Sequence, residues 1–225
     1  MFQGRVIDAV VVFDLDDTLY LERDYVESGL RAVGDWATDQ LGIAGMGVGM
    51  LEHFGAGARG HLFDDALAGA GIEPTPALIA RMIQVYRQHR PRIQLAEDAA
   101  RYLACPPPRT GLALITDGYL DAQKRKIRAL GLHASGIEIA VCTDRWGREN
   151  WKPSCRAFEH VQAFFGLPAG AFVYVADNPA KDFHAPKRLG WHSVQISRSG
   201  RLHVAASAGS EPADRRIDSF DSLIV

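Results

Sequence analysis

The sequence has few cysteines, no long hydrophobic run and almost no excess charge. Its three cysteines, Cys105, Cys142 and Cys155, lie far apart without a CxxC pair, so neither a disulfide framework nor a thiolate metal site is indicated. No apolar stretch approaches the length of a membrane-spanning helix. The formal net charge of −2 gives no electrostatic reason to expect nucleic-acid or membrane-surface binding. Because the first residues also lack a signal-peptide layout, we expect a cytoplasmic globular protein with reduced thiols.

The 225 residues, 47% of them apolar, suffice for one large domain or for a domain with a smaller companion. Between Leu21 and Pro91 the apolar spacing is helical and no strand is evident. The glycine-rich segment Gly42–Gly60 is open to two interpretations, a mobile connection or a loose helix around residues 46–54. We therefore predict one domain from residues 1–20 and 92–225, and a helical domain from residues 21–91.

After Pro91 the pattern alternates between short buried strands and amphipathic helices. We expect strands at 10–13, 112–115, 137–142, 171–176 and, last in the chain, 191–196; helices are expected at 96–104, 120–130, 154–165 and 186–189. This alternation predicts an α/β fold, a doubly wound parallel sheet with right-handed crossovers. In such sheets the ligand binds beyond the carboxyl ends of the strands.

Polar side chains follow the predicted strands at that edge. Residues 11–20, VVFDLDDTLY, place Asp14, Asp16 and Asp17 directly after a β-branched run. Thr116 follows a second strand, and Asp177 with Asn178 follows a third. A buried carboxylate is costly unless a cation or strong hydrogen-bond donors compensate it. The cluster of aspartates therefore indicates a metal site, a shared proton, or both.

Four motifs, in this order, resemble those of the haloacid dehalogenase-like (HAD) hydrolase superfamily. They are DLDDT at 14–18, LITD at 114–117, Lys152-Pro153, and VADNPAKD at 175–182. Together they extend over nearly the whole chain, which makes the combination far more specific than any one motif. The resemblance implies a Rossmann-like core with a small helical cap, residues 21–91, inserted after the first motif.

The resemblance also implies catalytic and metal-binding roles. Asp14 would be the nucleophile that becomes an aspartyl-phosphate, and Asp16 would protonate the leaving oxygen and then activate water. We expect Asp16 to point to the same side of the extended segment as Asp14. Mg²⁺ would be held by Asp14, the backbone carbonyl of Asp16 and Asp177, an all-oxygen set that suits a hard ion. Lys152 would place a positive charge against the nucleophile and the transferring group.

Phosphate binding and support of the metal ligands are assigned in the same way. The residues expected to bind phosphate are Thr116, Asp117 and Lys152. Asp182, Asn178 and Thr18 are expected behind the ligands, and Asp182 would either support the metal or orient Lys152.

Each residue alone also has a simpler structural interpretation. Asp17 is best explained as a turn residue that caps the next helix. Thr116-Asp117-Gly118 could be a plain strand-to-helix turn, and Lys152-Pro153 an exposed loop before a helix. Asp177 and Asp182 could cap helices.

The leading hypothesis is a Mg²⁺-dependent phosphatase of a small phosphorylated metabolite, such as a sugar phosphate or nucleotide. A phosphomutase of the same superfamily and a non-catalytic binding protein on this fold remain alternatives. Dehalogenation is disfavoured because dehalogenases of the family lack an acid at the position of Asp16. Phosphonate cleavage would need a Schiff-base lysine from the cap, and residues 21–91 contain no lysine.

Overall fold

The computed structural model describes residues 6–202 and 209–224. The chain forms two compact units: Asp24–Ile93, here called the helical unit, and the remainder, here called the sheet unit. The helical domain predicted from the sequence, residues 21–91, begins and ends a few residues earlier than this unit. The chain leaves the sheet unit once, after its first strand, and returns before the second.

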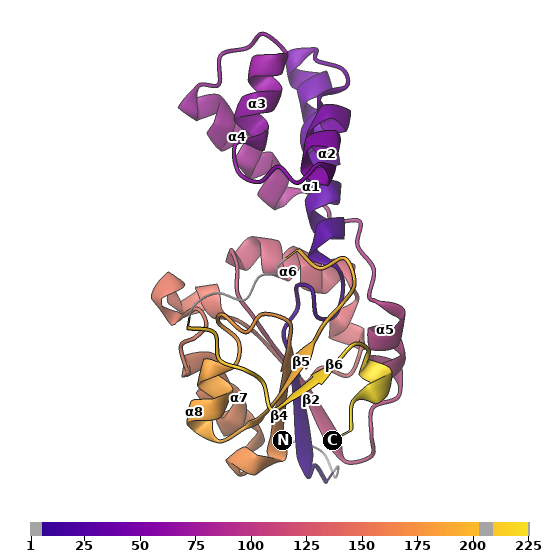
Figure 1. Cartoon of the computed structure of the whole chain (residues 1–225), viewed down its shortest axis with the longest axis vertical. Helices are drawn as coiled ribbons and strands as arrows, with labels where there is room; N and C mark the ends of the chain where they lie inside the picture. Colours follow the sequence, from indigo (N-terminus) through magenta and orange to yellow (C-terminus); the bar gives the residue numbers. More distant parts are fainter. Residues whose placement is uncertain (1–5, 203–208, 225) are drawn as a thin grey trace. The chain divides into compact units, whose positions relative to one another are not determined.

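The sheet unit contains a parallel sheet whose strands follow the order β3-β2-β1-β4-β5-β6 (Figure 1). The strands are β1 Ala9–Phe13, β2 Thr110–Thr116, β3 Ile139–Cys142, β4 Phe172–Ala176, β5 His192–Ile196 and β6 Arg215–Ile217. The predicted doubly wound parallel sheet is therefore confirmed. The prediction that the strand at 191–196 is the last was wrong, since β6 pairs in parallel beyond it.

Helices cover both faces of this sheet. They are α5 Glu97–Ala104, α6 Leu120–Ala129, α7 Arg156–Phe165 and α8 His184–Leu189, with α7 and α8 on one face and α5 and α6 on the other (Figure 1). Val10 and Val12 of β1 belong to the same core cluster as Phe158 of α7. Phe13 packs edge-on against Tyr102 of α5 on the opposite face. The uniformly apolar run of β1 is thus explained by burial on both sides.

The helical unit consists of α1 Glu22–Leu41, α2 Met46–Gly55, α3 Leu62–Gly69 and α4 Pro76–Gln88. Helix α2 settles the two interpretations of the glycine-rich segment in favour of a helix. Gly47 of α2 and Gly34 of α1 allow these two helices to pack closely, since a Cβ on Gly34 would lie 2.4 Å from the Cα of Gly47. Helix α4 begins with Pro76 in its first turn, and the Thr75 hydroxyl accepts a hydrogen bond from the Leu78 N–H.

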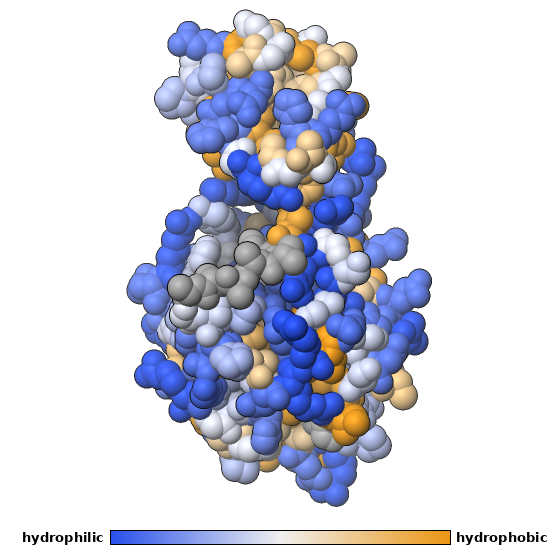
Figure 2. All heavy atoms as spheres, viewed as in Figure 1, coloured by the Kyte–Doolittle hydropathy of each residue, from blue (hydrophilic) through white to orange (hydrophobic). Residues whose placement is uncertain are grey.

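In the described residues, no helix combines the length and apolar character that crossing a bilayer requires. Much of the face drawn in Figure 2 is hydrophilic. The large apolar side chains that are exposed are Val6, Val48, Tyr119, Phe164 and Ile224. They lie on separate segments of the chain, as isolated exposed apolar residues of globular proteins commonly do.

Candidate active site

The candidate site lies where β1 and β4 end side by side. In the strand order of this sheet the connections diverge between these two strands, which is where doubly wound sheets bind ligands. Asp14 follows β1 directly and Asp177 follows β4. The pairing of the two strands sets the positions of Asp14 and Asp177 along the sheet, because the Asp14 N–H donates a hydrogen bond to the Val175 carbonyl at 2.9 Å. Strand register thus brings together two aspartates that are far apart in the sequence.

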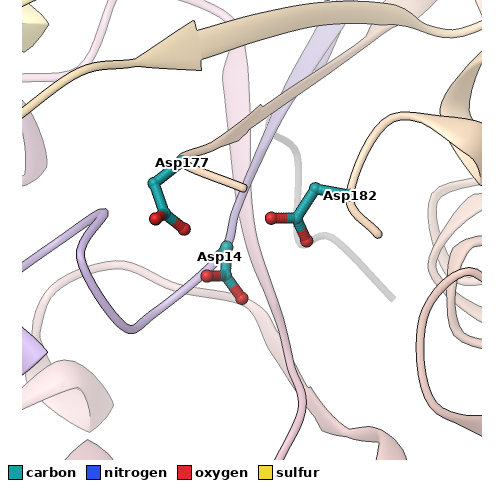
Figure 3. Close-up of side chains that lie close together, drawn as sticks. All are labelled: Asp14, Asp177 and Asp182. Carbon is teal, nitrogen blue, oxygen red and sulfur yellow. The ribbon is translucent and has the colours of Figure 1, made fainter. Parts of the chain in front are cut away.

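Asp14, Asp177 and Asp182 form a buried carboxylate cluster (Figure 3), with one oxygen from each within 4.8 Å of the others. Burial, together with the charges of Asp14, Asp182 and Asp17, raises the pKa of Asp177 to about 9. Burial likewise raises the pKa of Asp14 to about 7, although Lys152 opposes the rise. Among the described residues no hydrogen-bond donor reaches Oδ2 of Asp177. The cluster therefore lacks positive charge on the side of Asp177.

A hard divalent cation fits this deficit, since carboxylate oxygens are the ligands that Mg²⁺ prefers. Asp14 and Asp177 are the residues placed to hold it. Asp182 is already engaged: Oδ1 lies 2.7 Å from the Lys152 ammonium, and Oδ2 accepts the Asn178 N–H at 3.0 Å. The contact with Lys152 is the one that the expected orienting role of Asp182 requires, and the role itself stays a prediction. Asn178 in turn accepts the Ala180 N–H, which closes the turn after β4.

Lys152 is the buried cation of the cluster, and its side chain has no exposed surface. Its Nζ lies 2.5 Å from Oδ1 of Asp14 and donates to the Tyr174 hydroxyl at 3.0 Å. Burial acts to lower the pKa of Lys152, but Asp14 and Asp182 outweigh it and hold the pKa well above its usual value. The interpretation of Lys152 as an exposed loop residue was wrong.

Asp117 was predicted to bind phosphate, but its carboxylate faces other groups. Oδ1 accepts hydrogen bonds from the Thr143 hydroxyl at 2.7 Å and from the Lys152 N–H at 3.1 Å. The carboxylate thus fastens the segment that carries Lys152, and a carboxylate would repel a phosphoryl group. The prediction must therefore be restricted to the backbone N–H of Asp117. Thr116 ends β2 as expected, and its hydroxyl accepts a hydrogen bond from Gln123 at 2.6 Å.

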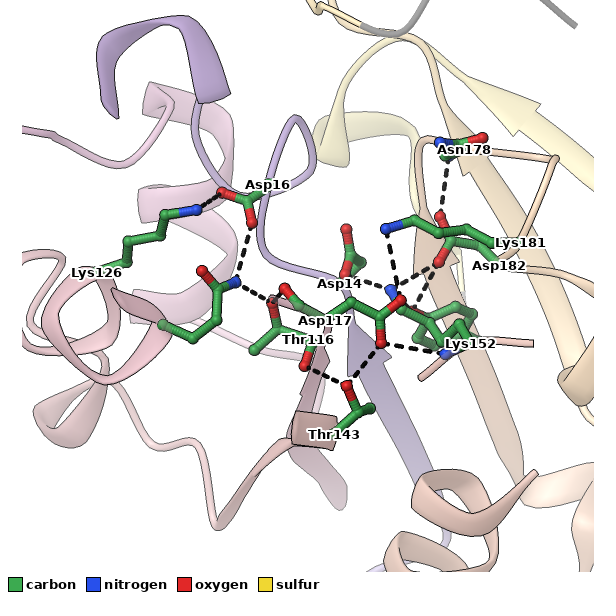
Figure 4. A network of polar contacts seen from close by, with 12 residues as sticks. Asp14, Asp16, Thr116, Asp117, Lys126, Thr143, Lys152, Asn178, Lys181 and Asp182 are labelled. Atoms are coloured by element: carbon green, nitrogen blue, oxygen red, sulfur yellow. Dashed lines mark hydrogen bonds and ion pairs between the residues drawn. The ribbon is translucent and has the colours of Figure 1, made fainter. Parts of the chain in front are cut away.

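Asp16 does not point as predicted. Its carboxylate faces α6, where Lys126 Nζ lies 2.7 Å from Oδ1 and Gln123 donates to Oδ2 at 3.0 Å (Figure 4). Tyr20 also donates a hydrogen bond to Oδ1. Burial acts to raise the pKa of Asp16, but Lys126 and the other donors outweigh burial and lower it. The reason for the different direction is that the loop after Leu15 turns back, so the alternation of an extended strand no longer applies.

The other two polar residues of the first motif, Asp17 and Thr18, hold this loop in place. Asp17 has a left-handed backbone conformation, φ 53°, and its carboxylate accepts the Glu22 N–H at 2.9 Å and the Leu202 N–H at 2.7 Å. The prediction that Asp17 is a turn residue binding the start of the next helix is confirmed. Thr18 is fully buried, and its carbonyl accepts a hydrogen bond from Arg198 at 2.6 Å.

Three further polar residues of this region, Gln123, Lys126 and Lys181, were not predicted from the sequence. Gln123 and Lys126 lie three residues apart on α6, which places them on one face of the helix that follows the second motif. That spacing was a signal that could have been used. Lys181 stands inside the fourth motif, and its Nζ lies 3.6 Å from Oδ2 of Asp117. Burial and the charge of Lys152 act to lower its pKa, but the carboxylates of Asp182, Asp14 and Asp117 raise it overall.

Among known proteins, the chain is similar in sequence to phosphatases and in fold to a dehalogenase. No family model matches the chain. The glyceraldehyde 3-phosphate phosphatase of Methanocaldococcus jannaschii is 27% identical over 95% of this chain and 94% of its own length. A phosphoserine phosphatase of Thermus thermophilus is 30% identical over 64% of this chain and 56% of its own. The 2-haloacid dehalogenase structure from Pseudomonas syringae is 22% identical, covers 96% of each chain and has a TM-score of 0.64.

Proposed function

We propose that the chain is a hydrolase of the haloacid dehalogenase-like superfamily and acts as a Mg²⁺-dependent phosphatase of a small phosphorylated metabolite. The observation that carries the proposal is the buried pair of Asp14 and Asp177, at the switch point of the sheet, with Asp14 fastened to a buried lysine. The names of the related phosphatases support a phosphate ester as substrate. Both of those names refer to small phosphorylated molecules.

The chemistry begins at Asp14. Its carboxylate oxygen attacks phosphorus, the bond to the leaving oxygen breaks, and an aspartyl-phosphate remains. Lys152 holds the attacking carboxylate in one orientation through its contact with Oδ1. Mg²⁺ held by Asp14 and Asp177 would supply positive charge to the phosphoryl oxygens and offset the crowding of the carboxylates.

Asp16 is the residue proposed to move protons. It would protonate the leaving oxygen in the first half of the reaction and take a proton from the attacking water in the second. In the structure Asp16 is bound to Lys126 and Gln123 on the side of α6, so either role requires its carboxylate to turn from those partners. Water attack on the aspartyl-phosphate then releases inorganic phosphate and restores Asp14.

The helical unit is proposed to act as a cap that selects the substrate. Its sequence contains none of the four motifs, so the groups that perform the chemistry all belong to the sheet unit. This division of tasks leaves the choice of leaving group to residues 24–93.

The direct test is turnover of p-nitrophenyl phosphate and of a panel of phosphorylated metabolites, glyceraldehyde 3-phosphate and phosphoserine among them, with Mg²⁺ and with EDTA. We expect Mg²⁺-dependent release of phosphate by the wild type and none by Asp14→Asn, because an amide cannot form the acyl phosphate. Rapid-quench labelling with a ³²P-substrate should place the label on Asp14. Full activity of Asp14→Asn, or a wild type inactive on the whole panel, would contradict the proposal.

A further inference from the structure

The side-chain amide of Gln123 joins two of the predicted site residues. Gln123 lies on α6 and is 1% exposed. Its Nε2 donates one hydrogen bond to Oδ2 of Asp16 at 3.0 Å and another to the Thr116 hydroxyl at 2.6 Å. An amide nitrogen carries two hydrogens, so these two contacts use both of them. Gln123 therefore contacts the end of β2 and the loop after β1 at the same time.

The contact with Asp16 fixes which end of the amide faces Thr116. An ionised carboxylate only accepts hydrogen bonds, and Asp16 forms an ion pair with Lys126 at 2.7 Å. The group of Gln123 that faces Asp16 must therefore be the nitrogen and not the oxygen. Because the same nitrogen lies next to the Thr116 hydroxyl, that hydroxyl can only accept the hydrogen bond and cannot donate it.

This assignment leaves the hydroxyl hydrogen of Thr116 available. A threonine hydroxyl has one hydrogen to donate and two lone pairs that accept. Gln123 occupies one lone pair. Among the described residues the only acceptor near the hydrogen is the Asp117 carbonyl at 3.4 Å, which is longer than a normal O–H···O hydrogen bond. An acceptor that enters the site can therefore take this hydrogen with little competition.

Strand pairing places the Thr116 hydroxyl near the nucleophile. In the pairing of β1 with β2, Phe13 lies opposite Leu114. Asp14 directly follows Phe13, and Thr116 is two residues beyond Leu114, so both residues leave the sheet at the same edge. In the proposed reaction the acceptors at this edge are the phosphoryl oxygens of the ester, which carry negative charge.

We propose that Gln123 is a positioning residue that directs the hydroxyl hydrogen of Thr116 toward the phosphoryl oxygens of the substrate. This inference rests on the proposed phosphatase function and on the phosphate-binding role predicted for Thr116. With Gln123 on one lone pair, the hydroxyl presents its hydrogen to the substrate. Without Gln123 the hydroxyl rotates freely, and part of the orientation that stabilises the charged oxygens is lost.

The test is a double-mutant cycle between Gln123→Met and Thr116→Val, read as the Kd of inorganic phosphate by calorimetry in Mg²⁺. Thr116→Val removes the hydroxyl at nearly constant shape and should weaken phosphate binding by about 10- to 150-fold, the range for a hydrogen bond to a charged group. Gln123→Met alone should weaken it by about 2- to 10-fold, the range for a neutral hydrogen bond. In the Thr116→Val background Gln123→Met should change the Kd by less than about twofold, because the group that it orients is absent.

Three further variants complete the cycle. Thr116→Ser keeps the hydroxyl, so Gln123→Met should have its full effect in that background. Gln123→Asn is one methylene shorter and cannot reach both partners, so it should weaken phosphate binding like Gln123→Met and takes its place in the cycle if that variant does not fold. Lys124→Met, an exposed neighbour on α6, is the control and should bind phosphate like the wild type.

The outcomes separate this inference from the proposed function. Wild-type phosphate affinity in folded Gln123→Met or Gln123→Asn overturns the role of Gln123, even if the wild type is an active phosphatase. An undiminished effect of Gln123→Met in the Thr116→Val background also overturns it, because Gln123 would then not act through the hydroxyl. A wild type that turns over no ester, yet binds phosphate with this coupling, contradicts the phosphatase proposal and supports the positioning role.

Discussion

Asp177→Asn should stabilise the metal-free protein although it removes a proposed metal ligand. The Asp177 carboxylate is 3% exposed, and no hydrogen-bond donor among the described residues reaches its Oδ2. Its pKa is raised from 3.8 to about 9. Between these two values the folded protein holds a proton that the unfolded chain releases, so raising the pH destabilises the fold over this window. The neutral amide removes that dependence.

The magnitude follows from the same displacement. One pKa unit corresponds to about 1.4 kcal/mol, so the full window sets an upper limit of several kcal/mol. Relaxation of the site and burial of the amide reduce the gain, and we expect about 1–3 kcal/mol of unfolding free energy at pH 8. For a chain of this length that corresponds to a rise in Tm of about 2–4 °C per kcal/mol.

The assay is urea and thermal unfolding in EDTA at pH 5 and pH 8, with Asp121→Asn, an exposed carboxylate on α6, as the control. The stabilisation by Asp177→Asn should be largest at pH 8 and shrink toward pH 5. Adding Mg²⁺ at 100 times its Kd should stabilise the wild type by about 2.7 kcal/mol and the variant far less. A variant less stable than the wild type in EDTA at pH 8, or one with an undiminished response to Mg²⁺, would refute this reasoning.

Three further predictions concern other parts of the molecule. Lys152→Ala should lower kcat/KM by about 10²–10³-fold and cost about 3–5 kcal/mol in urea unfolding, because it leaves buried carboxylates without their cation; a variant within about twofold of the wild type would contradict this. Gly34→Ala should destabilise the helical unit by about 1–3 kcal/mol, since its Cβ would meet the backbone of Gly47. Gly49→Ala, whose Cβ meets nothing within 4 Å, is the control and should not destabilise it. Hydrogen exchange in residues 24–93 measures the stability of both variants. Replacing residues 23–90 by a Gly/Ser linker should leave slow hydrolysis of p-nitrophenyl phosphate but remove discrimination among metabolites, and a folded product with the wild-type order of kcat/KM would show that the helical unit does not set specificity.

Structure could be predicted from the sequence where the local residue pattern and the tertiary fold favour the same secondary structure. The β-branched run before Asp14 predicts a strand buried on both faces, and β1 is such a strand. Parallel pairing then brings the ends of β1 and β4 together, so the proximity of Asp14 and Asp177 could be predicted without coordinates. The edge strand β6 could not, because Arg215-Arg216-Ile217 has too little apolar alternation to signal a strand.

What the sequence could not provide is the direction of side chains in the loops. Asp16 follows a strand, but its direction is set by Lys126 and Gln123, which lie more than 100 positions along the chain. Likewise, the Lys152 ammonium donates a hydrogen bond to the hydroxyl of Tyr174, a residue whose sequence context indicates only a buried strand. Tertiary contacts of this kind decide which of several charged residues faces the substrate, and no periodicity encodes them.

The place where the helical unit interrupts the chain has a consequence for how the protein is made. On a ribosome β1 is synthesised first, yet both strands that flank it in the sheet, β2 and β4, emerge only after the whole of Asp24–Ile93. A strand as apolar as Val10–Phe13 must therefore wait without its neighbours while the helical unit is completed. Contacts at such sequence separation form slowly, so β1 is the segment of the nascent chain most in need of protection from aggregation.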